Sequence, residues 1–267
     1  MKYLKLFMLL FLSSNSVLAE GFGISMDKDY YFKKFTDNEL EITVTNDSSK
    51  LLFANIFIYE GKPDAATGKI AFDYKDKVLG YDIHPEKIAI PAGQKRKVKF
   101  IRALQRKIDT YGEEEYYRVR VIPKSPEDAI KTNPQLLNLL TASEKKQLED
   151  SDKTEGALKV FIGSGSVIVV QNNFDITKKD INIGLKKSND EVIFKILNIS
   201  NKTIYFSKTK AFAKDKWVTL GDFAIRGGKT KELSVSYKEL EKNGISNSKI
   251  ERLLFTSQNG QEINIQI

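Results

Sequence analysis

The residue types on which most hydrolytic and metal chemistry depends are almost absent from this chain. It has no cysteine and a single histidine, His84. A cysteine nucleophile and a thiolate zinc site are therefore excluded, and a Ser–His–Asp triad would have to use His84, which lies beside Pro85 in a strand-like run. Carboxylates are abundant, but no pair of them has a distinctive spacing. The sequence predicts no catalytic residue, metal ligand or cofactor, and it favours a binding protein in which His84 is a surface or packing residue.

The residues best suited to binding are apolar and lie in one stretch, "GALKVFIGSGSVIVV" (156–170), whose only charged side chain is Lys159. Alternate side chains of a strand point to opposite sides, so one face of its first half carries three large apolar groups: Leu158, Val160 and Ile162. The stretch exceeds an average strand of about 5–6 residues. It is either a fully internal strand or a strand whose first half is left for a partner.

The elements around this stretch are mostly short strands. "ELEITVTN" (39–46) alternates apolar and polar residues before a turn at "DSS", and "KVKFI" and "YYRVRVI" show the same alternation. "ILNISNKT" (196–203) repeats the pattern of "ITVTNDSS" in the second half of the chain. Short alternating strands separated by turn residues indicate antiparallel sandwiches. The fold class expected is all-β.

Two further features divide the chain. Leucine-rich, polar sequence over 125–155 predicts one or two short helices inserted before the long apolar stretch. A polar segment near 170–174 predicts a boundary between an N-terminal domain, 20–171, and a C-terminal domain, 172–267.

The N-terminus predicts export. Residues 1–19 carry Lys2 and Lys5, then an apolar core, then the small-residue end "VLA", which is the layout of a cleaved secretory signal peptide. The net charge of +8 is mild for 267 residues, and the lysines are scattered. We therefore expect no nucleic-acid partner and no direct membrane insertion.

Several of these segments resemble one family when they are taken in order. "IHPEKIAIPAGQKRKVKFI" (83–101) is similar to the proline–glycine segment of the periplasmic chaperones of pilus assembly, and "EEEYYRVRVIP" (113–123) is similar to the strand that follows it there. The order of signal peptide, "TVTN" strand, these two segments, a loop and a long apolar strand also matches. The chain is identified as a suspected member of the PapD-like superfamily, closest to the alternate chaperone branch of the chaperone–usher pathway.

This resemblance implies two immunoglobulin-like β-sandwich domains in a boomerang arrangement. It implies that the last strand of the first domain completes the unfinished sandwich of a pilin, called donor-strand complementation, and that an outer-membrane usher receives the subunit. Strand addition satisfies a free sheet edge with main-chain hydrogen bonds while alternate side chains fill a groove. The implied location is the periplasm, and a self-capping dimer is a further expectation.

The resemblance also implies site residues. Leu158, Val160 and Ile162 are the expected groove-filling side chains; the other register, with Ala157, Lys159 and Phe161, would place the charge of Lys159 in the groove. That family binds the subunit's terminal carboxylate with an Arg and a Lys. Here alignment from Asn46 places Tyr30 at the arginine position and no charge within 163–169, which leaves Lys28 as the candidate anchor.

Three arginines could take the place of the missing basic residue, although each fits a solvated strand face better: Arg102, Arg118 and Arg120. An alternative function is a structural or adhesive pilus component built from two β-sandwich domains. A pilin would carry a donor extension at its mature N-terminus, whereas the long apolar strand here is internal.

Overall fold

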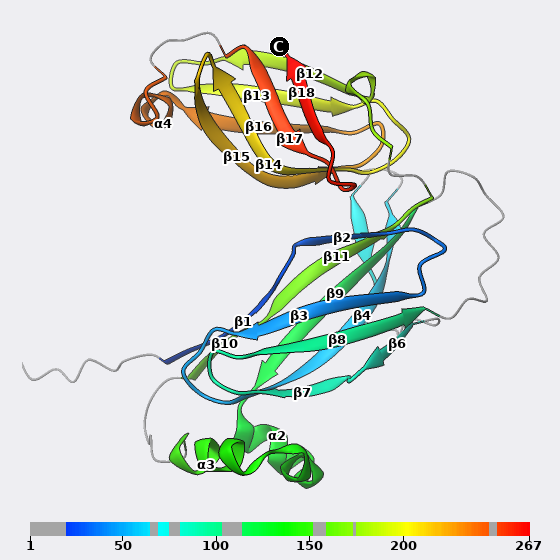
Figure 1. The fold of residues 1–267 in the computed structure, drawn as a ribbon, viewed down its shortest axis with the longest axis vertical. Coiled ribbons are helices and arrows are strands. Elements are labelled where there is room, and N and C mark those ends of the chain that lie inside the picture. The colour runs from blue at the N-terminus through cyan, green and yellow to red at the C-terminus, as the bar shows by residue number, and fades with distance from the viewer. Residues whose placement is uncertain are drawn as a thin grey trace, which may run out of the picture.

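The structure, a computed structural model, describes residues 20–64, 69–74, 81–102, 114–151, 159–172, 175–245 and 250–267. The predicted signal peptide and Leu158 lie outside these residues. Figure 1 shows two β-sandwiches joined end to end at an angle, with helices below the first sandwich. The predicted all-β class and boomerang arrangement are confirmed.

In the first sandwich, one sheet has the strand order β10-β1-β3-β8-β6 and the other has the order β2-β11-β9-β4-β5, with β7 also paired to β4. The strands of the first sheet are β10 (Lys159–Ile162), β1 (Glu20–Met26), β3 (Glu39–Asn46), β8 (Lys95–Arg102) and β6 (Tyr81–His84). Those of the second are β2 (Tyr30–Lys33), β11 (Ser164–Val170), β9 (Glu115–Lys124), β4 (Leu52–Pro63), β5 (Ile70–Phe72) and β7 (Lys87–Ile90).

The second sandwich packs the sheet β12-β13-β16 on the sheet β15-β14-β17-β18. Its strands are β12 (Ile181–Lys187), β13 (Glu191–Asn198), β14 (Ile204–Ala213), β15 (Lys216–Ile225), β16 (Thr230–Ser236), β17 (Arg252–Thr256) and β18 (Glu262–Gln266), with the short helices η2 (Lys178–Asp180) and α4 (Tyr237–Lys242). The domain division at 171/172 falls between β11 and η2 and stays a prediction.

The alternation read from the sequence forms the core of the first sandwich. Ile42 of β3, Val98 and Phe100 of β8, and Val119 of β9 are fully buried between the two sheets. The polar residues between them point outward, as the two-residue period of a strand requires. The apolar pattern therefore specifies which face of each strand meets the other sheet.

The same turn closes one strand in each sandwich. Asn46 is fully buried at the end of β3; its side-chain amide donates to the carbonyls of Lys50 and Ile90, and its side-chain oxygen accepts from the N–H of Ser48. Asn198, equally buried at the end of β13, makes the matching bonds with the carbonyls of Lys202 and Ile225 and with the N–H of Ser200. The similar sequences "TN.SS" and "LNISN" thus form the same asparagine-centred turn in the two sandwiches.

The predicted helical insertion consists of α2 (Pro126–Thr132), η1 (Pro134–Leu139) and α3 (Ala142–Ser151). The Ser125 side chain caps α2 by accepting from the N–H of Asp128 at 3.0 Å. The helices bury Leu136 and Leu140 against Leu51 and Phe53 of the first sandwich. The insertion is therefore packed on the sandwich end that lies farthest from the second sandwich (Figure 1).

Among the residues that the structure describes, no helix is long and apolar enough to cross a membrane.

Candidate functional site

The first half of the long apolar stretch forms an exposed edge strand. β10 is the terminal strand of its sheet and pairs in parallel with β1, Glu20 with Lys159 through Gly23 with Ile162. Val160 and Ile162 are 42% and 59% exposed, whereas Phe161 points the other way and packs against the core. This arrangement favours the register that uses Val160 and Ile162 over the one that uses Phe161. The assignment of Leu158, Val160 and Ile162 as groove-filling residues stays a prediction.

Two glycines let the stretch pass from one sheet to the other. A Cβ on Gly163 would lie 2.8 Å from the carbonyl oxygen of Val121, and one on Gly165 would lie 3.0 Å from that of Val119. The distance at Gly163 is too short for a side chain and the one at Gly165 is unusually tight, so the backbone of the stretch approaches β9 closely here. The glycines therefore mark the point where β10 ends in one sheet and β11 begins in the other.

The second half of the stretch belongs to the protein's own core, as its two-sided apolar pattern indicated. Ile168 and Val170 of β11 pack into the core of the first sandwich, and Val169 is equally buried. β11 is held between β9, in antiparallel register, and β2, in parallel register. A rigid strand on both sides fixes the position from which β10 projects.

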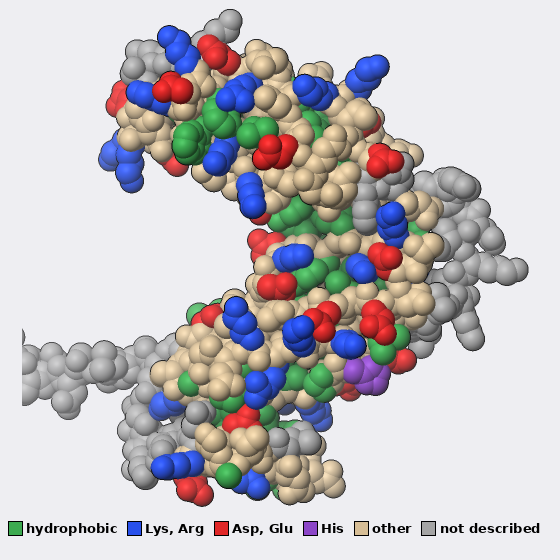
Figure 2. Space-filling model, viewed as in Figure 1, with side chains coloured by type: hydrophobic (Ala, Val, Ile, Leu, Met, Phe, Trp, Pro, Cys, Tyr) green, Lys and Arg blue, Asp and Glu red, His purple; other side chains and the backbone are tan. Residues whose placement is uncertain are grey.

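Between the two sandwiches lies an open cleft of about 770 Å³. Figure 2 shows it as the hollow on the concave side of the molecule. Its lining comes from the segment around β2 and from the near end of the second sandwich, and includes Asp27, Lys28, Asp29, Tyr30, Lys33, Glu41, Tyr205 and Asp222. Lys28, the candidate carboxylate anchor, is thus among the residues that line this cleft.

The charges of this cleft do not favour a carboxylate. Lys28 does line it and lies 5.8 Å from the centre of the Tyr31 ring, but its chain neighbours Asp27 and Asp29 line it too. Tyr31 donates a 2.5 Å hydrogen bond to Asp27, and burial, reinforced by this bond, raises the pKa of Tyr31 well above its usual value. A carboxylate entering here would meet carboxylates already present, so Lys28 as anchor stays a prediction that its surroundings disfavour.

Tyr30, which alignment places at the family's arginine position, lies beside the uncharged stretch 163–169, in which the second basic residue of the family is not assigned. Tyr30 of β2 is in register with Val167 of β11, and Val167 is in register with Arg118 of β9. Burial, followed by the charge of Asp29, raises the pKa of Tyr30, and the charge of Arg118 offsets part of this rise. Arg118 therefore lies on β9, one strand farther into the sheet than Val167.

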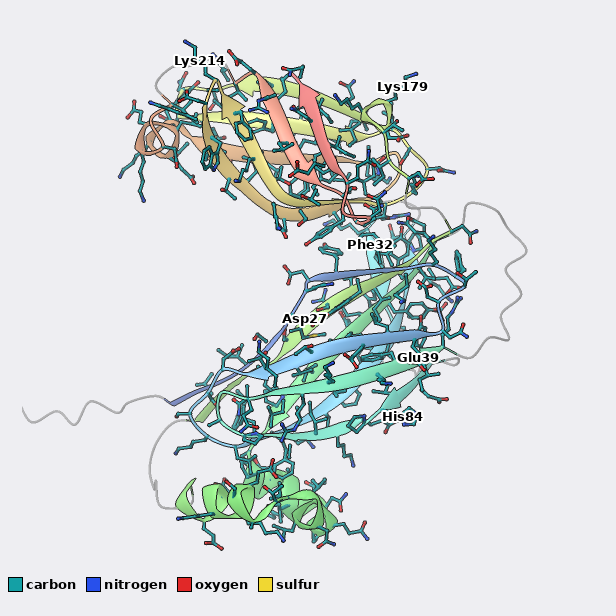
Figure 3. The ribbon with its side chains drawn as sticks, in the orientation of Figure 1. Asp27, Phe32, Glu39, His84, Lys179 and Lys214 are labelled. Carbon is teal, nitrogen blue, oxygen red and sulfur yellow. The ribbon has the colours of Figure 1, made fainter. Side chains whose placement is uncertain are left out.

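The sandwiches are joined by contacts that the sequence did not reveal. The ring of Tyr205 in β14 lies 5.5 Å from that of Tyr30 and 5.7 Å from that of Phe32, and its hydroxyl donates to Asp222 at 2.9 Å. Figure 3 places Phe32 at this junction and Asp27 farther out in the cleft. Aromatic packing of this kind restrains the angle between the two sandwiches.

A second contact crosses the junction through Glu114, just before β9. Its carboxylate accepts from the hydroxyl of Thr203 at 2.7 Å and also binds the Thr203 N–H and the Tyr116 hydroxyl. Arg226 donates to the same Tyr116 hydroxyl at 3.2 Å. These partners are buried or partly buried, so the network fixes the first sandwich to the second.

This network predicts a loss of stability at high pH. Burial, with the nearby charge of Glu114, raises the pKa of Tyr116 from 10.0 to about 12. Between these values the folded protein keeps a proton that the unfolded chain has lost, so the free energy of unfolding falls as pH rises from about 10 to 12. Denaturant titrations at pH 9 to 11.5 would show the decline, and Tyr116→Phe should make it shallower. The control is Tyr74→Phe, because the Tyr74 side chain is half exposed. If the free energy of unfolding declined with pH equally in the two variants, Tyr116 would not be a source of the decline.

His84 is exposed at the end of β6, opposite Lys99 (Figure 3). Among the residues that the structure describes, no group of three or more histidine, aspartate or glutamate side chains is placed to hold a metal ion. The expected surface position of His84 is therefore what the structure shows.

The similarity to known proteins lies in the fold. No protein-family model matches the chain, and a search of curated proteins gave no match. Among solved structures, the Escherichia coli chaperone DraB superposes with a TM-score of 0.51 over 93% of this chain and 99% of its own, at 9% identity. The resemblance seen in the sequence is thus confirmed as a shared fold, that of a two-domain pilus chaperone.

Two other similar structures are complexes. The Salmonella enterica chaperone SafB, bound to the SafA pilin, has a TM-score of 0.48, 10% identity, and coverage of 93% of this chain and 100% of its own. The Acinetobacter baumannii chaperone CsuC, bound to the tip subunit CsuE, has a TM-score of 0.46, 11% identity, and coverage of 92% and 97%.

Proposed function

We propose that this protein is a periplasmic chaperone that holds a pilus subunit by donating β10 as the strand that the subunit lacks. The observation that carries the proposal is the pair of exposed apolar side chains, Val160 and Ile162, at alternate positions of an edge strand. Exposed apolar edges promote unwanted pairing, and folded proteins avoid them unless they are used.

The energetics of this interaction suit reversible capture. Burying each of the two side chains in a subunit groove contributes roughly 1.5–3 kcal/mol. The free edge of β10 adds main-chain hydrogen bonds to a strand of the subunit. The shared fold with the chaperone DraB supports the same role, and passage of the subunit to an outer-membrane usher completes the proposal.

The alternative, a pilus component, is less well supported. A component that receives a donor strand needs an open groove in its own sandwich. Here each sandwich closes two sheets over a buried core, with Phe100 fully buried in the first and Phe194 in the second. The exposed apolar residues lie on an outer edge instead, which suits a donor of a strand.

Co-expression with a pilus subunit tests the proposal. We expect the two proteins to leave the periplasm as a one-to-one complex, and the pilin alone to be degraded or aggregated, because its groove is then exposed to water. Analytical size exclusion of the periplasmic extract measures both. Equal recovery of folded pilin with and without this protein would contradict a chaperone role.

A further inference from the structure

The second sandwich carries a compact group of aromatic and basic side chains on the outer face of its larger sheet. We call it the Trp217 face, and its members are Trp217 of β15, Phe212 and Lys210 of β14, and Arg252 of β17. In the antiparallel register Phe212 opposes Trp217 on one side and Arg252 on the other. The residues next to them in sequence, Ala211, Val218 and Leu253, are buried in the core, so the row formed by the other three points outward.

Both basic side chains of this face lie on its aromatic rings. The guanidinium carbon of Arg252 is 4.0 Å from the centre of the Phe212 ring, and the Nζ of Lys210 is 4.7 Å from that of the Trp217 ring. The centres of the two rings are 6.0 Å apart. A cation over a ring is attracted by the charge distribution of the ring, so these contacts hold the two positive charges beside the aromatic groups.

The two charges are open to a partner from outside. Neither Lys210 nor Arg252 forms an ion pair with a carboxylate among the residues that the structure describes, whereas Lys195 on the other sheet of this sandwich pairs with Glu232 at 3.8 Å. Trp217 is 46% exposed. A large exposed ring between unpaired cations is costly to leave in water and marks an interaction surface.

The charge around this face is positive. The turn between β14 and β15 adds the exposed Lys214 and Lys216, against the acidic Asp215 in the same turn and Glu251 just before β17. Glu251 accepts a hydrogen bond from the N–H of Lys214 at 3.3 Å. Figure 3 places Lys214 at the end of the second sandwich that lies away from the first, and Figure 2 shows hydrophobic side chains with Lys and Arg around them on this sandwich. The face is thus apolar at its centre and basic at its border.

We propose that the Trp217 face rests on the surface of an anionic membrane, with Trp217 at the level of the lipid headgroups and the basic side chains against the phosphates. Tryptophan is enriched at membrane–water interfaces because its ring is apolar and its N–H is polar. Lysine and arginine near an anionic lipid surface are attracted to it without any fixed geometry. Cations arranged around an exposed ring on an open sheet fit such a surface, whereas a partner with fixed acceptors needs donors in one geometry.

This contact goes beyond the proposed function, because it lies on the second sandwich and needs neither β10 nor a subunit. It is peripheral, since the side chains reach only the headgroups and no segment crosses the bilayer.

Fluorescence of the wild-type protein tests the contact directly, because Trp217 is the only tryptophan of the chain. The probe is vesicles of phosphatidylethanolamine with about 30% phosphatidylglycerol. We expect the emission of Trp217 to move to shorter wavelength, brominated lipid to quench it, and the protein to sediment with the vesicles. Neutral phosphatidylcholine vesicles should have none of these effects. Raising the ionic strength from about 0.05 to 0.5 M should release the protein, since salt screens the charges.

Variants show which side chains carry the contact, and their partition onto vesicles is measured by sedimentation. Lys210→Gln/Arg252→Gln should lower the partition at least about tenfold, because two attracted charges are lost. Trp217→Ala should lower it about threefold or more, since the ring no longer enters the headgroup region. The exchange Lys210→Arg/Arg252→Lys keeps both charges and should bind like the wild type, because a lipid surface responds to charge and not to the donor geometry in which the two residues differ.

The matched controls change similar side chains on the first sandwich. Lys97→Gln/Lys99→Gln removes two charges from one strand, β8, where they are paired with Glu41 and Glu39. Tyr74→Ala removes an aromatic ring that is 50% exposed. Both controls should keep the wild-type partition, and all variants should keep the wild-type thermal midpoint.

Five results would overturn the proposal. They are no quenching of wild-type Trp217 by brominated lipid, which needs no variant to fold; equal sedimentation with neutral vesicles; equal weakening by either control; equal weakening by the exchange variant and the glutamine variant; and a larger shift of the Trp217 emission with soluble polyaspartate than with the anionic vesicles. The last two would show that the face binds a partner with fixed acceptors, such as an acidic protein segment, instead of a lipid surface.

Discussion

Replacement of both Val160 and Ile162 by aspartate is expected to abolish recovery of the pilus subunit from the periplasm. Both side chains are exposed in the free protein, at 42% and 59%, so the change costs the chaperone itself little stability. In the complex each aspartate would enter an apolar groove, where an unpaired charge is strongly disfavoured. The loss of two apolar contacts, roughly 3–6 kcal/mol together, already corresponds to more than a hundredfold in affinity.

The matched control changes exposed apolar residues elsewhere. Ile199 and Trp217 of the second sandwich are 55% and 46% exposed, so Ile199→Asp/Trp217→Asp introduces the same charge at a similar exposure. Subunit recovery is quantified from affinity-purified chaperone on a stained gel. Normal recovery of the subunit with the Val160/Ile162 variant, or an equal loss of recovery with the control variant, would show that β10 does not bind the subunit.

The largest stability effect is expected at the two buried turn asparagines. Asn46→Ala leaves the carbonyls of Lys50 and Ile90 and the N–H of Ser48 without their partner, and Asn198→Ala does the same in the second sandwich. Leaving buried polar groups unsatisfied costs about 1–3 kcal/mol each, and relaxation recovers part of it. We expect each variant to lose roughly 2–4 kcal/mol in the free energy of unfolding.

Urea titration followed by circular dichroism measures this loss. Asn201→Ala is the control, because Asn201 is exposed and lies only three residues beyond Asn198. Variants at Asn46 or Asn198 that unfold at the same urea concentration as the control would show that the turn bonds contribute nothing net.

Much of the fold could be predicted from the sequence because a strand's two-residue period is local. The pattern of "ELEITVTN" identifies Leu40, Ile42 and Val44 as one face, and that face is the buried one. The two "TN" and "LN" turns were also visible as a repeat. The hydrogen bonds of the two asparagines could not be predicted, because their acceptors, the carbonyls of Ile90 and Ile225, lie far along the chain.

The helical insertion was predicted only in part. Its leucines indicated helix, and Leu136 and Leu140 are indeed on its buried side. Their partners are Leu51, which directly precedes β4, and Phe53 near its start. A contact between a helix and a strand end more than eighty residues apart has no signature in local periodicity.

The candidate site, like the helical insertion, was predicted only in part. The exposed alternation in β10 follows from local sequence and was predicted, although Leu158 lies outside the described residues. The acidic cleft was not, because it combines Asp27 and Asp29 of the first sandwich with Asp222 of the second. The contact of Glu114 with Thr203 spans 89 residues and likewise depends on the packing of whole sandwiches.

The central claim, that β10 is the strand given to a subunit, is tested most directly by amide hydrogen exchange of the chaperone with and without bound pilin. Among the described residues, β10 pairs with β1 on one side and ends its sheet on the other, so half of its amides have no strand partner there in the free protein. We predict that peptides covering Lys159–Ile162 become strongly protected in the complex, while β11, already paired on both sides, changes little. A complex that protects other segments and leaves the exchange of β10 unchanged would contradict the account.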